Sequence, residues 1–167
     1  NCVAIAQENN AAGWQQTSGF VKKIIELFSK DFGQYNYPKI VAADAGDGME
    51  YPMITVIGNA SSKEELEVVI VHEVGHNWFY GILGSNERVH GWMDEGLNTL
   101  NEMRYVQTKY PDNTRFSDMV AGGRFHLNDL DHHDSGDIMY RSLASFGLDQ
   151  PLEIHSDDFS SMNYGAI

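Results

Sequence analysis

The pattern His72-Glu73-Val74-Gly75-His76 constrains this chain more than any other feature of its sequence. Residues four apart lie on one face of an α-helix, so both imidazoles can bind one metal ion. Glu73 directly follows the first histidine, where it can take a proton from metal-bound water. Residues 77–94, 18 in number, separate this pattern from Glu95, a carboxylate suited to be the third ligand. Two His, one Glu and an open fourth position are typical of a catalytic zinc site, because structural zinc sites usually have four protein ligands.

The alternative interpretation of this stretch is an amphipathic helix with two exposed or hydrogen-bonded histidines. Three observations count against it: a strong helical context, a second helix-like segment that carries Glu95, and a further motif at residues 47–51. We therefore predict one zinc ion bound by His72, His76 and Glu95, with Glu73 as the catalytic residue of a hydrolase.

Composition narrows the classes of partner. The formal net charge of the 167 residues is -13, which disfavours nucleic acid and anionic membranes as partners. The one cysteine, Cys2, excludes an internal disulfide and a cysteine-based zinc site. No apolar run approaches the ~20 residues of a membrane span. The compartment stays open: a cytoplasmic, secreted or bacterial-envelope location all fit.

Hydrophobic periodicity predicts both strands and helices. Short apolar runs predict strands at residues 3–6, 39–43 and 53–58. Helices are expected over residues 17–33, from Ser61 or Ser62 through the metal pattern to about Tyr80, over 92–110, and over 138–146. In the first of these helices, the expected core stripe is Phe20, Ile24, Leu27 and Phe28.

Two further groups of polar residues have open interpretations. Glu102 lies seven residues after Glu95 on the same helix face. It is either a partner that hydrogen-bonds a metal-bound histidine or an exposed carboxylate. The segment 128–137 is rich in oxygen and nitrogen ligands, but its spacing does not fit a calcium-binding EF-hand loop. We predict a solvated acidic loop there.

The metal pattern followed by Asp94-Glu95-Gly96, with Trp78-Phe79 after the second histidine, resembles the zinc aminopeptidases of the aminopeptidase N type, within the gluzincin group. The resemblance implies an α+β fold with a thermolysin-like catalytic domain, a small mixed lobe followed by helices. We expect residues 1–167 to form one such domain, a segment of a longer chain whose other domains are further partners. The expectation of a segment is based on the missing initial Met and the abrupt end at Ile167.

The stretch Asp47-Gly48-Met49-Glu50-Tyr51 falls where that family carries Gly-Ala-Met-Glu-Asn. The family's glutamate grips the α-amino group of the substrate, and its backbone aligns the peptide. The resemblance therefore implies that Glu50, Gly48 and Met49 bind substrate. The first, second and last positions differ from the family, and an ordinary carboxylate at a strand edge is the alternative for Glu50.

The family also carries an oxyanion-stabilising Tyr in a Tyr-x-Lys-Gly context, which is absent here. Asn163-Tyr164-Gly165-Ala166-Ile167 is similar to the stretch just before that Tyr in some bacterial members. We expect the chain to stop a few residues short of it. Because losing such a donor typically costs ~10²–10³ in rate, we expect this segment alone to be weakly active or inactive.

These observations predict a zinc-dependent peptidase that removes N-terminal residues from peptides, with Glu73 activating a zinc-bound water. Two alternatives remain open. One is a vestigial domain that binds zinc or peptide without turnover, although an intact Glu73 argues against it. The other is a zinc hydrolase or endopeptidase with a different range of substrates.

Overall fold

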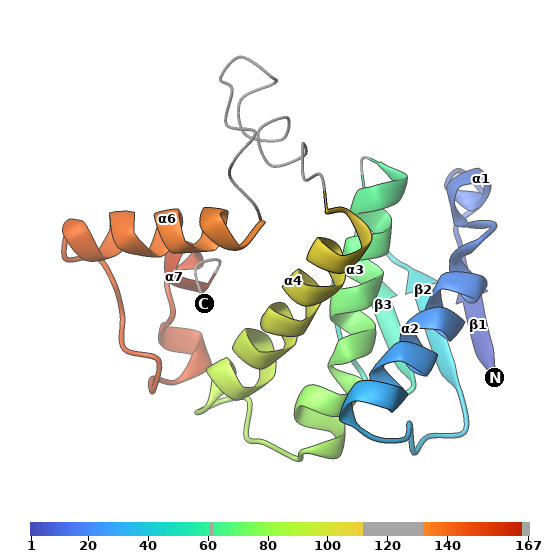
Figure 1. Cartoon of the computed structure of the whole chain (residues 1–167), viewed down its shortest axis with the longest axis horizontal. Helices are drawn as coiled ribbons and strands as arrows, with labels where there is room; N and C mark the ends of the chain where they lie inside the picture. Colours follow the sequence, from blue (N-terminus) through green and yellow to red (C-terminus); the bar gives the residue numbers. More distant parts are fainter. Residues whose placement is uncertain (61, 112–131, 165–167) are drawn as a thin grey trace. The chain divides into compact units, whose positions relative to one another are not determined.

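The computed structural model describes residues 1–60, 62–111 and 132–164. The chain divides into two compact units, Asn1–Ser85 and Asn86–Ile167, which are described separately below. Figure 1 labels their helices and strands. Both units contain helix and only the first contains strands among the described residues, so the mixed composition expected from the sequence is present. The single thermolysin-like catalytic domain stays a prediction.

A three-stranded parallel sheet organises the first unit. Its strands are β1 (Cys2–Ile5), β2 (Ile40–Asp44) and β3 (Ile54–Ile57), in the order β1-β2-β3. The register pairs Ala4 with Ala42 and Ala42 with Thr55. The three strand predictions are confirmed to within two residues at each end. Apolar β-branched runs specify these strands because they fit a pleated, buried surface.

Helices α1 (Ala11–Trp14) and α2 (Thr17–Phe32) connect β1 to β2, and α3 (Lys63–Gly75) follows β3. α2 packs against β1, β2 and α3, and α3 also packs against β3 (Figure 1). The buried stripe of α2 is Val21, Ile24 and Phe28. Leu27, which we expected in the core, is 37% exposed. The expected stripe is therefore right at Ile24 and Phe28 and wrong at Leu27, while Phe20 is only half-buried and Val21 lies in the core.

Local interactions determine where α3 begins and ends. Ser62 caps its N-terminus, because its side chain accepts a hydrogen bond from the backbone N–H of Glu65 at 3.1 Å. After His76 the chain continues as a π-helical turn, η1 (Asn77–Ile82), with a kink at Phe79 and Tyr80. Tyr80 has φ 89°, a conformation that a non-glycine residue rarely adopts. The prediction of one helix to about Tyr80 is thus right in position but missed this kink.

The second unit is built from helices. They are η2 (Trp92–Gly96, π-helical), α4 (Leu97–Lys109), α6 (His132–Ser145), η3 (Ser156–Asp158) and α7 (Ser161–Tyr164), and α4 packs on α6. The helix expected over 92–110 is confirmed. The acidic loop expected over 128–137 is wrong for residues 132–137, which form the start of α6; residues 128–131 lie outside the described residues.

Two local features explain why α6 begins earlier than expected. Asp134 lies in its first turn, where a negative charge is favourable. Asp137 pairs with Arg141 one turn later at 2.8 Å.

Among the described residues of both units, no helix has the length and apolar composition that crossing a membrane requires.

Candidate functional site

The two histidines of the metal pattern lie together at the C-terminal end of α3. Their Nε2 atoms are 3.1 Å apart and their rings meet edge to face, with centroids 4.7 Å apart. His76 is 1% exposed, and His72 is half-buried. The last turn of a helix carries a partial negative charge, which favours a cation at this position. The sequence prediction that one helix face presents both imidazoles is confirmed.

This spacing fits the geometry of a zinc ion. Zn–N bonds are about 2.0–2.1 Å long, so two ligands of a tetrahedral ion lie about 3.3 Å apart. The Nε2 atoms are already close to that separation. A hydrogen bond between two neutral imidazoles, one the donor and one the acceptor, explains the same distance when no ion is bound. The first unit therefore supplies two of the three expected ligands in a suitable geometry.

Glu73 lies one residue after His72 and is 8% exposed. Its carboxylate approaches Gly48, the second residue of the segment 47–51 that we expect to bind substrate. A Cβ built on Gly48 would lie 2.7 Å from Oε1 of Glu73, closer than real Cβ contacts. Only a glycine permits this approach without movement of the carboxylate. The structure thus places the expected catalytic carboxylate next to the segment expected to bind substrate.

The backbone of α3 is tied to the sheet at the same residue. The hydroxyl of Thr55, which is 0% exposed, donates to the carbonyl oxygen of Glu73 at 2.9 Å. In the next residue of β3, Val56, both backbone groups bond to Met49, at 3.0 and 2.7 Å. Met49 therefore forms an antiparallel bridge beside β3. Glu50 follows this bridge directly and is half-buried.

Asn77, directly after His76, holds the C-terminal end of α3 in place. It is 1% exposed, and its Oδ1 accepts hydrogen bonds from the Tyr35 hydroxyl at 3.2 Å and from the Met53 backbone at 3.3 Å. Its Nδ2 donates to the carbonyl of Val74 at 3.0 Å. Burial, with a smaller effect of Tyr37, raises the pKa of Tyr35, so its phenol stays protonated as a donor.

In the second unit, Glu95 lies within η2, a π-helical turn. π-helical turns are rare and frequently occur at functional sites. Of the two found in the described residues, η1 begins one residue after His76 and η2 contains Glu95. The Tyr164 hydroxyl donates a short hydrogen bond, 2.6 Å, to Oε1 of Glu95. No sequence pattern indicated this contact, because the two residues are 69 positions apart.

Glu102 lies on α4, two turns after Glu95, and is 7% exposed. The alternative of an exposed carboxylate is therefore wrong. Its role as a partner of a metal-bound histidine stays a prediction. The assignment of Glu95 as a ligand also stays a prediction, because it belongs to the second unit and the histidines belong to the first.

Comparison with known proteins indicates an aminopeptidase-like relationship. The chain is 24% identical over 151 residues to leucine aminopeptidase 2 of Emericella nidulans, a match that covers 89% of this chain and 24% of that protein. It is 25% identical over 143 residues to leucine aminopeptidase 2 of Chaetomium globosum, covering 83% of this chain and 22% of that protein. The chain thus spans about a quarter of the length of these relatives. No protein-family model matches it.

Proposed function

We propose that this chain carries the catalytic centre of a zinc-dependent aminopeptidase with a thermolysin-like fold. In this proposal His72, His76 and Glu95 hold one zinc ion, and Glu73 is the general base. The observation that carries it is the pair of Nε2 atoms 3.1 Å apart at the end of α3, the helix that also carries Glu73. The similarity to two proteins named leucine aminopeptidase supports peptide hydrolysis.

When bound, zinc would act as a Lewis acid on the scissile carbonyl and lower the pKa of a water molecule. Glu73 takes the proton of the attacking water and then delivers it to the leaving amine. Glu73 is 8% exposed, so little bulk water competes for its carboxylate. Thr55 fixes the backbone from which Glu73 projects, so the side chain needs little reordering before the reaction.

Glu50 selects substrates with a free N-terminus. A carboxylate pairs with the α-ammonium group of a peptide, and this pairing distinguishes an aminopeptidase from an endopeptidase. The bridge between Met49 and Val56 supports this role, because it fixes the backbone directly before Glu50. It also places Gly48 against Glu73, so the amine-binding carboxylate and the base belong to one connected group of residues.

The first experiment is elemental analysis of the purified chain beside His72→Ala. We expect about one zinc per chain, lost in His72→Ala because one of three ligands is gone. Lys22→Ala is the control, since Lys22 lies on α2 in the same unit as His72 and has a side chain that is 69% exposed and pairs with Glu26. It should keep the zinc. Equal zinc content in all three proteins, or zinc in none, would contradict the proposed site.

Glu73→Gln then tests the chemistry. It should keep the zinc but abolish hydrolysis of a peptide substrate, because an amide cannot take up the proton of water. Hydrolysis at an unchanged rate would show that Glu73 is not the base. Hydrolysis of a peptide by the zinc-bound parent, even at a low rate, would exclude the alternative of a binding domain without turnover.

A further inference from the structure

Glu95, the expected third ligand, is held by a tyrosine. The hydrogen bond from the Tyr164 hydroxyl to Oε1 of Glu95 measures 2.6 Å. That length is typical of a hydroxyl bound to an ionised carboxylate, which is stronger than a bond between neutral groups. Outer partners of this kind orient metal-ligating side chains, and their removal typically costs 10–100-fold in metal affinity.

The backbone of Tyr164 is fixed by its neighbour Asn163, which is 6% exposed. The Asn163 side chain accepts from the Gln150 N–H at 3.1 Å and donates to the Leu148 carbonyl at 2.9 Å. It also donates to the Ser160 hydroxyl at 2.8 Å. The Tyr164 N–H donates to the Ser160 carbonyl at 2.9 Å. The tyrosine is 58% exposed, yet the position of its backbone is set by the hydrogen bonds of its buried neighbour Asn163.

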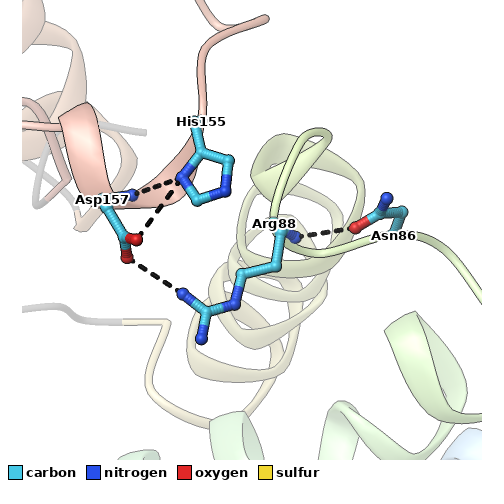
Figure 2. A network of polar contacts seen from close by, with 4 residues as sticks. All are labelled: Asn86, Arg88, His155 and Asp157. Atoms are coloured by element: carbon cyan, nitrogen blue, oxygen red, sulfur yellow. Dashed lines mark hydrogen bonds and ion pairs between the residues drawn. The ribbon is translucent and has the colours of Figure 1, made fainter.

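Residues 148–164, here called the strap, bind the segment 86–96 at a second point. Arg88 Nη1 pairs with Asp157 Oδ1 at 2.9 Å, and the Ser156 N–H donates to the Arg88 carbonyl at 2.8 Å. Figure 2 shows how Arg88 extends towards Asp157, with His155 on the other side of that carboxylate. The Asn86 side chain in turn accepts from the Arg88 N–H, which orders the start of the segment.

The strap has a third attachment to the segment 86–96, at residues that lie between Arg88 and Glu95 in the chain. Both carboxylate oxygens of Glu153 are used: Oε2 contacts Nδ1 of His90 at 2.7 Å, and Oε1 accepts from Nε1 of Trp92 at 2.9 Å. The Trp92 hydrogen bond, then the one from His90, lowers the pKa of Glu153. Trp92 is the first residue of η2, the turn that contains Glu95. The strap therefore forms hydrogen bonds to η2 both at its first residue, Trp92, and at Glu95.

The ion pairs of the strap are exposed, and exposed pairs contribute little to stability. Together with the Tyr164 contact, they act on the geometry of η2. We propose that Tyr164 is a positioning residue for Glu95. The strap holds the Tyr164 hydroxyl against the carboxylate of Glu95, and this contact orients that carboxylate as the third zinc ligand. This inference rests on the proposed function. The donor is a hydroxyl bound to the ligand itself, which separates Tyr164 from a residue that stabilises the oxyanion of the substrate.

The test is the zinc affinity of Tyr164→Phe, measured by competition of zinc alone against a chromogenic chelator. Phenylalanine keeps the ring and removes only the hydroxyl. We expect the zinc Kd to rise about 10–100-fold, with an unchanged melting temperature of the zinc-free protein. Tyr140→Phe is the matched control: Tyr140 lies on α6 in the same unit, is 50% exposed, and its hydroxyl bonds to no described residue. Its Kd should equal that of the parent.

A double variant separates positioning from a merely structural role. If Tyr164 acts through Glu95, then adding Tyr164→Phe to Glu95→Ala leaves the zinc Kd of the single Glu95→Ala variant unchanged. A further loss in that background, or a parent-like Kd for Tyr164→Phe alone, would overturn the inference. Suppose that the parent binds zinc, that His72→Ala loses it, and that Tyr164→Phe keeps full affinity. This result would refute only the positioning role of Tyr164. Parent protein without zinc refutes both proposals.

Discussion

Gly48→Ala is the substitution for which the structure gives the most definite expectation. The new Cβ would lie 2.7 Å from Oε1 of Glu73, whereas ordinary contacts begin at 3.4 Å. The carboxylate must therefore move by about 0.7 Å, the difference between these two distances. Gly48 does not occupy the left-handed region, so alanine fits its backbone. The change then displaces the carboxylate of the proposed base while leaving the fold intact.

The expected effect on the rate follows from that displacement. A misplacement of about 1 Å can cost ~10²-fold in rate, so a shift of this size should lower kcat about 10- to 100-fold. That corresponds to roughly 1.4–2.7 kcal/mol of barrier. The zinc content should not change, because neither His72 nor His76 has an atom within 4 Å of the new methyl group.

The assay is kcat for a saturating aminoacyl p-nitroanilide on zinc-loaded protein, with zinc content and melting temperature measured on the same samples. Gly19→Ala is the matched control, since a Cβ there meets nothing within 4 Å. Gly19 lies inside α2, where alanine should stabilise the protein by about 0.5–1 kcal/mol at unchanged kcat. An unchanged kcat in Gly48→Ala, with the methyl group accommodated, would refute the assignment of Glu73 as a base held against Gly48.

Three further predictions address the surroundings of the site. Glu50→Ala should lower kcat/KM for substrates with a free N-terminus and spare N-blocked peptides, as a paired substrate assay would show. Asn77→Ala should destabilise the fold by about 1–3 kcal/mol, seen as a lower urea midpoint at unchanged m-value, because the part-buried Met53 N–H and Tyr35 hydroxyl lose this acceptor. The pKa of Glu153 is lower in the folded state, so its contacts persist above the ordinary carboxyl range and weaken as pH falls through the lowered pKa. Trp92 fluorescence should report this transition, which Glu153→Gln should remove.

The parts of the fold that the sequence predicted correctly are specified by local chemistry. The three strands follow apolar β-branched runs, and the start of α3 follows from the hydroxyl of Ser62 three residues before Glu65. The proximity of His72 and His76 follows from helical spacing alone. None of these requires knowledge of a residue distant in the chain.

The parts that the sequence did not predict depend on distant partners. The kink after Asn77 accompanies bonds to Tyr35 and Met53, which are 42 and 24 positions away. The contact of Tyr164 with Glu95 spans 69 positions. The burial of Glu102 could not be read from periodicity, because its helix face is shared by polar residues. Helical spacing identified candidate ligands but gave no signal for the residues that hold them.

The arrangement around β3 explains how the proposed base and the proposed amine-binding segment keep a constant relation. Thr55 bonds to the backbone of Glu73, and its neighbour Val56 bonds to Met49 on both backbone groups. Two successive residues of β3 thus fix α3 and the segment before Glu50. If the proposed function holds, a peptide whose amine binds Glu50 keeps a constant position relative to Glu73, because β3 connects the two segments. Rigid support of this kind is what precise positioning in a site requires.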